Sequence, residues 1–77
     1  MSELEYYMGL PYRLEIIPDK EDGGYVINYP DLPGCMSCAD TKEDIWYMAE
    51  DAKKAWLAAA LEDGYEIPLP TAEKIPA

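Results

Sequence analysis

The sequence predicts an α+β domain in which a small antiparallel sheet of three to four strands packs on one long helix. Two observations predict this class: short strand-like segments come first along the chain, and a long apolar helical stripe follows them. The 77 residues suffice for one core, far below the roughly 250 to 300 residues at which chains divide into domains. We therefore expect one domain over residues 1–70 and a flexible tail at 71–77.

Four short segments bounded by turn residues predict the sheet. The clearest is residues 12–17, where alternate side chains face opposite sides as in a half-buried strand. We expect further strands at residues 24–29 and 35–39, and a short fourth strand at 65–67. A polar hairpin loop at 19–24 joins the first two strands, because its two glycines can take positive φ. The proline-rich segment 30–34 is predicted to form a rigid turn.

One long helix is predicted over residues 42–63. Its apolar residues recur at helical spacing and form a continuous stripe: Ile45, Met48, Ala49, Ala52, Trp56, Ala59 and Ala60. Asp40 or Thr41 is expected to cap its start, with Glu43 at the capping-box spacing from Asp40. Gly64 is expected to end the helix in the left-handed conformation.

The predicted helix is longer than the sheet that it covers. It spans ~33 Å, whereas a six-residue strand spans ~20 Å. Trp56, Leu57 and Leu61 on the overhanging half would be exposed unless the N-terminal segment, where a short helical turn is predicted, or a second copy covered them. We expect a homodimer or larger assembly, with Trp56 or Leu61 at or near the contact.

The chain is strongly acidic, with 16 Asp and Glu against 6 Lys and Arg and a net charge of −10. Affinity for nucleic acid comes largely from cations that release counterions, so direct DNA or RNA binding by this chain alone is not expected. Opposite potential favours a basic protein partner, and simple solubility accounts for the same charge equally well. No apolar run or basic N-terminus indicates a membrane span or signal peptide, so we expect a cytoplasmic protein.

The residue types argue against catalytic, metal and cofactor sites. The chain has no histidine, which excludes an imidazole base and a Cys/His zinc site made from one chain. Cys35 and Cys38 precede the helix start by several residues and should face opposite sides of a strand, which favours packing over redox chemistry. Glu15 is the only acid at the centre of a predicted strand, so a two-metal nuclease is not expected. We predict no enzyme activity and no cofactor.

The order of these segments resembles the HicB antitoxin family over nearly the whole chain. The motifs that carry the resemblance are Tyr-Arg-Leu-Glu-Ile-Ile-Pro at 12–18, Gly-Gly-Tyr at 23–25, Pro-Asp-Leu-Pro-Gly-Cys at 30–35, Asp-Thr at 40–41, Glu-Asp-Gly at 62–64 and Ile-Pro-Leu-Pro at 67–70. Each motif is weak alone, and their combination is specific. Ala39 departs from the glycine that the family usually has before Asp-Thr.

The resemblance implies a partial ribonuclease-H-like domain and a type II antitoxin. Its partner would be a HicA-like toxin, a small basic protein that cleaves mRNA and whose active surface the antitoxin masks. Longer members carry a DNA-binding segment after the proline-rich stretch, whereas this chain stops at Ala77, so the resemblance does not extend to operator binding. The alternative is a stand-alone adaptor or regulatory protein that kept the fold without a toxin.

A toxin-binding surface is predicted where acids and large apolar side chains come together. We expect the hairpin loop and the turn at 30–34 to lie at one end of the molecule, with loop acids that speed encounter and aromatic anchors on the second strand. The predicted residues are Asp19, Glu21, Asp22, Tyr25, Tyr29, Asp31 and Leu32. Leu32 packing under its own turn, with solvated acids, is the competing interpretation.

Overall fold

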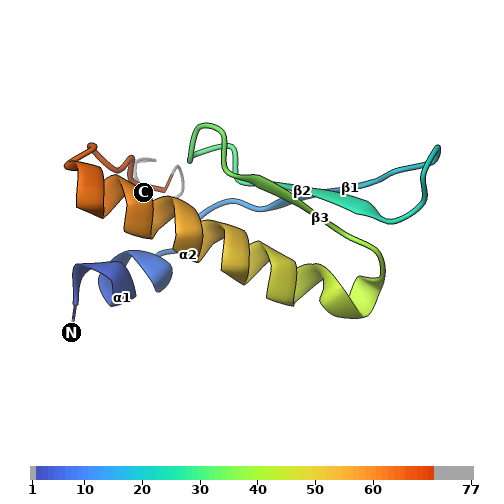
Figure 1. Ribbon diagram of the computed structural model, residues 1–77, viewed down its shortest axis with the longest axis horizontal. Coiled ribbons are helices and arrows are strands. Elements are labelled where there is room, and N and C mark those ends of the chain that lie inside the picture. Colours follow the sequence, from blue (N-terminus) through green and yellow to red (C-terminus); the bar gives the residue numbers. More distant parts are fainter. Residues whose placement is uncertain (1, 71–77) are drawn as a thin grey trace, which may run out of the picture.

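A three-stranded antiparallel sheet and one long helix form two layers in the computed structural model, which describes residues 2–70 (Figure 1). The elements are α1 (Glu3–Met8), β1 (Glu15–Pro18), β2 (Tyr25–Asn28), β3 (Met36–Ala39), the 3-10 turn η1 (Lys42–Asp44) and α2 (Ile45–Asp63). The predicted α+β class, with its sheet and long helix, is therefore confirmed. The tail predicted at 71–77 lies outside the described residues.

The central strand β2 separates a buried face of the sheet from an exposed one. It pairs antiparallel with β1 and β3, and Ile27 lies opposite Ile16 and Ser37. Residues opposite one another share a face, so this row points toward α2, where Ile27 is fully buried. The alternate residues point the other way, and two of them, Ile17 and Met36, are 52% and 60% exposed. The helix therefore covers one face of the sheet.

The edge strand β1 is shorter and more exposed than predicted. It begins at Glu15, and all four of its residues are exposed, because α2 packs on β2 and β3. Tyr12 is buried outside the strand, and its hydroxyl donates a hydrogen bond to the Pro68 carbonyl at 2.7 Å. The fourth strand predicted at 65–67 is wrong: that segment has no strand, and Ile67 instead packs its side chain into the core. Prolines lack the N–H that a strand ladder needs.

The start of the long helix differs from the prediction, and its end agrees. The first turn is the 3-10 turn η1, and neither Thr41 nor Asp44 makes a side-chain cap, so the predicted capping box does not form. At the other end, Gly64 takes the left-handed conformation with φ of 70° and ends α2 as predicted. With 19 residues, α2 spans ~28 Å and extends beyond the sheet.

Within the chain, α1 covers the overhanging half of α2. Ser2 accepts a hydrogen bond from the Glu5 amide at 3.2 Å and begins α1, whose Leu4, Tyr7 and Met8 pack against the core. Figure 1 shows α1 beside the C-terminal half of α2. Leu57, which was expected to overhang, is fully buried there. The N-terminal segment, one of the two covers predicted for this half, is therefore confirmed, and the second copy stays a prediction.

Candidate partner-binding surface

The hairpin loop presents carboxylates on a defined backbone. The Asp19 carboxylate accepts hydrogen bonds from the backbone amides of Glu21 and Asp22, at 3.0 and 3.2 Å, and so fixes the turn. The Glu21 and Asp22 side chains are exposed. This part of the predicted surface is therefore accessible, and Asp19 has a structural role within it.

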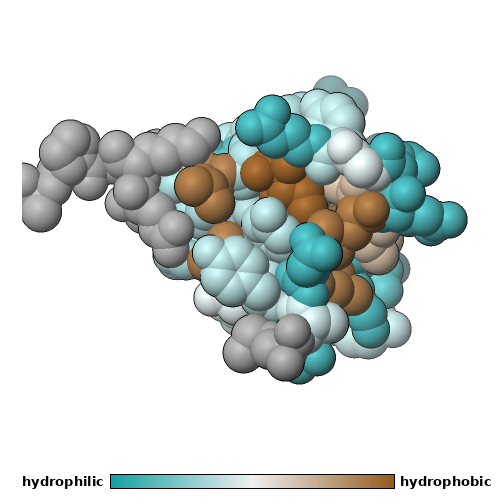
Figure 2. Space-filling model, turned by 90° about the vertical axis from the view of Figure 1, so that its left-hand side faces the viewer, coloured by the Kyte–Doolittle hydropathy of each residue, from teal (hydrophilic) through white to brown (hydrophobic). Residues whose placement is uncertain are grey.

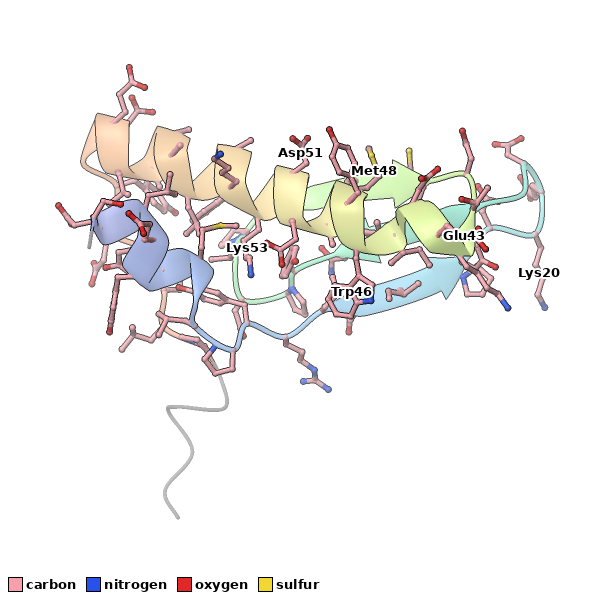
Figure 3. The ribbon with its side chains drawn as sticks, turned by 90° about the horizontal axis from the view of Figure 1, so that it is seen from below. Lys20, Glu43, Trp46, Met48, Asp51 and Lys53 are labelled. Atoms are coloured by element: carbon pink, nitrogen blue, oxygen red, sulfur yellow. The ribbon has the colours of Figure 1, made fainter. Side chains whose placement is uncertain are left out.

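Gly24 holds this loop against the start of the helical segment. Its φ is 79°, and a Cβ atom there would lie 2.6 Å from the Ala39 carbonyl oxygen, so no side chain fits. Ala39 and Asp40 lead directly into η1. The loop and the first turns of α2 therefore lie at the same end of the molecule (Figures 1 and 3).

The turn at 30–34 lies at the opposite end of β2, which corrects the prediction of one continuous surface. Its backbone is tied by hydrogen bonds from the Leu32 amide to the Tyr29 carbonyl and from the Cys35 amide to the Leu32 carbonyl, at 3.0 and 2.9 Å. Leu32 is fully buried under this turn and Tyr29 is 3% exposed, so neither side chain is an accessible anchor. Asp31 is half-buried in the same turn, away from the loop acids, and Tyr25 is half-buried on β2.

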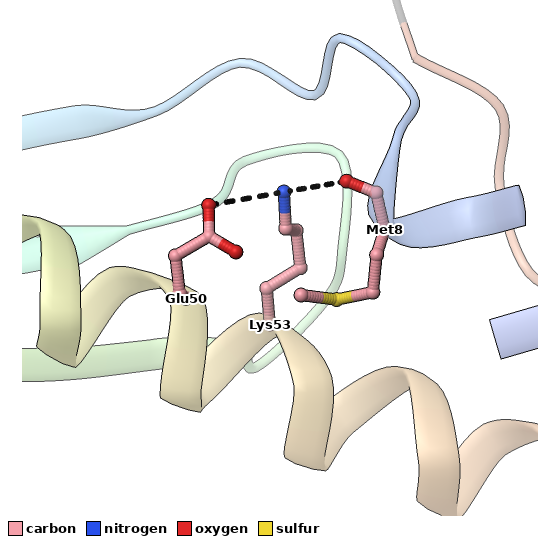
Figure 4. Close-up of polar contacts among 3 residues, drawn as sticks. All are labelled: Met8, Glu50 and Lys53. Atoms are coloured by element: carbon pink, nitrogen blue, oxygen red, sulfur yellow. Dashed lines mark hydrogen bonds and ion pairs between the residues drawn. The ribbon is translucent and has the colours of Figure 1, made fainter. Parts of the chain in front are cut away.

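Tyr29 belongs to a buried polar cluster around Lys53 that the sequence did not reveal. The Lys53 ammonium donates a hydrogen bond to the Met8 carbonyl at 3.1 Å, lies 4.0 Å from the Glu50 carboxylate and 5.8 Å from the centre of the Tyr29 ring (Figure 4). Burial, with smaller contributions from Glu50 and Cys35, raises the pKa of Tyr29 to about 12. This cluster joins α1, α2 and the residue that follows β2, so its role is structural.

Trp56 and Leu61, predicted at a self-association contact, are half-buried against the core. The Trp56 indole donates a hydrogen bond to the Pro33 carbonyl at 2.8 Å and meets the edge of Tyr65. An open groove of about 530 Å³ lies beside them, lined by Pro33, Trp56, Ala59, Ala60, Asp63, Gly64 and Tyr65. Figure 2 looks onto this end of the molecule, where apolar side chains are exposed between hydrophilic ones.

Two aromatic residues that the sequence interpretation passed over are the most exposed large apolar side chains of residues 2–70. Trp46 is 67% exposed and Tyr47 is 72% exposed, both in the first turn of α2. Neither belongs to the apolar stripe that predicted the helix. The sequence signal that could have identified them was their position outside the apolar stripe of the helix, where aromatic residues are expected to be exposed.

The cysteines face opposite sides of the sheet, as predicted. Cys35 is buried and its thiol donates a hydrogen bond to the Ala52 carbonyl at 3.5 Å, whereas Cys38 is exposed. Burial raises the pKa of the Cys35 thiol, and Lys53 opposes that shift. Among residues 2–70, no three His, Cys, Asp or Glu side chains come together as metal ligands. The same residues contain no helix that is long and apolar enough to cross a membrane.

Comparison with known proteins agrees with the order of these elements. Residues 11–75 match the model of a family described as the HicB-like antitoxin of bacterial toxin–antitoxin systems. The chain is 38% identical over 63 residues to Antitoxin HicB 1 of Photorhabdus laumondii, matching 82% of this chain and 39% of that protein. It is also 37% identical over 60 residues to UPF0150 protein Ta0767 of Thermoplasma acidophilum, matching 78% of this chain and 87% of that protein.

A third relative is a 14.9 kDa protein from the rep-hol intergenic region of Haemophilus phage HP1, with 38% identity over 50 residues. That match covers 65% of this chain and 38% of the phage protein. The chain thus spans about two fifths of the length of Antitoxin HicB 1 and of the phage protein. The family match covers most of the chain, from the residues before β1 through the end of α2. The chain belongs to the HicB-like antitoxin family.

Proposed function

We propose that this chain is the antitoxin of a toxin–antitoxin pair and neutralises a small basic HicA-like toxin by covering its RNA-cleaving surface. Family membership is the observation that carries this proposal. The function requires binding and no chemistry by the antitoxin, so we propose a protein without enzyme activity.

The charge distribution supports a basic partner. The segments 19–24 and 40–51 contain eight carboxylates and two lysines, and they extend from the hairpin-loop end of the molecule to about its middle. Such a concentration of negative charge attracts a cationic protein over a distance of about 8 to 10 Å at physiological ionic strength. It also repels the phosphates of a nucleic acid, so we propose that the chain blocks the toxin and leaves the RNA untouched.

Co-purification and growth rescue test this proposal together. The chain, expressed with an affinity tag in its native host, should retain a small Lys-rich protein encoded in a neighbouring reading frame. Induction of that protein alone should arrest growth, and co-expression of the chain should restore it. A chain that retains no basic protein and rescues no growth would contradict the proposal and favour the stand-alone adaptor.

The loop acids provide a separate test of the electrostatic part. Replacing Glu21 and Asp22 together by lysine should slow association with the toxin and weaken its salt dependence, because exposed charges mainly affect the association rate. Glu62→Lys, at the far end of α2, is the matched control. Self-association stays a prediction, and light scattering at high micromolar concentration tests it.

A further inference from the structure

The first two turns of α2 carry an aromatic pair that points away from the protein's own core. Ile45 and Ala49 occupy the inward side of the helix and are buried. Each residue along a helix turns by about 100°, so Tyr47 projects from the outer side and Trp46 from the adjoining flank of the helix, with exposed fractions of 72% and 67%. Tryptophan is highly buried on average in folded proteins, and an exposed pair of this kind marks an interaction surface.

Carboxylates surround this pair on the helix. Glu43 is one turn before the two aromatics and Glu50 is one turn after them, at spacings of three or four residues, and Asp51 is four residues after Tyr47. Glu43 and Asp51 are exposed, and the Glu50 side chain is 55% exposed although one of its oxygens approaches Lys53. We call Glu43, Trp46, Tyr47, Glu50 and Asp51 the aromatic face of α2. Figure 3 shows Glu43 near the end of the molecule that also holds the hairpin loop, and Trp46 farther toward the middle, on the opposite side of α2 from Asp51 in that view.

Charge and chemistry select one occupant for this face. The segment from Glu43 to Asp51 contains four carboxylates and no lysine or arginine, so a nucleic acid is repelled and a second copy would bring two acidic faces together. Arginine and lysine side chains stack on indole and phenol rings and pair with carboxylates, and the aromatic face offers both. A basic protein therefore complements it in both respects.

We propose that the aromatic face of α2 is the docking surface for the toxin, with Trp46 and Tyr47 as anchors for its arginine and lysine side chains. The inference rests on the proposed function and adds the surface and the contact chemistry. Tryptophan and tyrosine are enriched among residues that dominate binding energy, and both are rigid on a helix. The neighbouring loop acids Glu21 and Asp22 direct the approach, and the aromatic face then holds the partner.

Binding measurements with four variants test the surface. The probe is a catalytically inactive form of the toxin that co-purifies with the chain, and the readouts are Kd and the two rate constants. Trp46→Ala and Tyr47→Ala should each weaken binding at least about tenfold, mainly through faster dissociation. Tyr65→Ala, at the far end of α2 and 56% exposed, is the matched aromatic control and should bind as the wild type does. Glu43→Gln should slow association and leave dissociation nearly unchanged.

The outcomes separate this inference from the proposed function. If the wild type binds the toxin and both aromatic variants bind equally well, the docking surface lies elsewhere and the inference is wrong while the function stands. If the wild type retains no toxin, both the proposed function and the assignment of the toxin to this face are wrong. A free chain that changes from dimer to monomer on Trp46→Ala would assign the face to a second copy and also overturn the inference. Circular dichroism and the melting temperature confirm that each variant is folded.

Discussion

The two halves of α2 contain similar apolar residues, and what packs over them differs. In the first half, the sheet covers one side of the helix, and Trp46 and Tyr47 project into solvent. In the second half, α1 and the segment 65–70 pack alongside, and Leu57 is fully buried while Trp56 is half-buried. The predicted overhang was real, but Leu57 is buried within the chain, and Trp56 and Leu61 are half-buried. The exposed aromatics are on the half that the sheet was expected to protect.

This contrast shows that tertiary neighbours decide which helical side chains are available to a partner. Leu57 lies outside the stripe of the amphipathic pattern and is buried in the half of α2 on which α1 packs. Tyr47 is also outside that stripe and has no such cover. Substitutions of apolar residues in the second half of α2 should therefore reduce stability, whereas substitutions of the exposed aromatics in the first half should reduce binding.

The largest expected effect is on stability, in the covered half. Leu57→Ala should lower the free energy of unfolding by about 2 to 5 kcal/mol, because it leaves a cavity in the core. Tyr47→Ala should change it by about 0.5 kcal/mol or less, since the side chain is exposed. Urea unfolding followed by circular dichroism measures both. Equal destabilisation by the two substitutions would contradict the conclusion that Leu57 is buried in the core and Tyr47 is not.

The Lys53 cluster fixes α1 to the covered half, so its loss should release α1. Lys53→Met removes the donor to the Met8 carbonyl and should cost about 1 to 3 kcal/mol. Amide hydrogen exchange should speed up in α1 while the first half of α2 is unaffected. Lys54→Met, at the exposed neighbouring position, is the control and should leave α1 protected.

Titration of Tyr29 should reduce stability at high pH. Its folded pKa is about 12, above the ordinary value of 10, so the unfolded chain loses this proton first. The stabilisation is complete below pH 10 and is lost as the pH rises toward 12, on the order of 2 kcal/mol in all. The difference in unfolding free energy between the wild type and Tyr29→Phe should shrink over that range, because the other titrating groups are common to both. A constant difference would contradict the assignment.

The smallest effect concerns the thiols. At pH 8, iodoacetamide should modify the exposed Cys38 at least about ten times faster than Cys35, whose pKa is raised by burial. Mass spectrometry of the resulting peptides gives the two rates. The ratio should approach one in urea, and equal rates in the folded protein would show that the sheet opens locally.

The sequence alone predicted the features that local chemistry determines. The hairpin loop, its positive-φ glycines, the long helix and its end at Gly64 all follow from glycine and proline positions and from helical spacing. The binding surface was predicted less well, because burial depends on distant segments. Leu32 and Tyr29 are residue types that often anchor a partner, but both are buried here. The turn at 30–34 covers Leu32, and Lys53 packs on the Tyr29 ring. The prediction of a fourth strand was wrong for a related reason: the Ile67 side chain is buried in the core, and its segment does not pair with the sheet.

The tight fit at Gly24 has a consequence for how this protein can evolve. A residue with any side chain at that position would collide with the Ala39 carbonyl, so selection on the fold removes most changes there. Lys20, Glu21 and Asp22, a few residues earlier, are exposed, and changes at these positions leave the core untouched. The loop can therefore exchange its charges while one glycine keeps its backbone in place. The partner specificity that we propose for this loop can therefore change by substitutions at three positions without loss of stability.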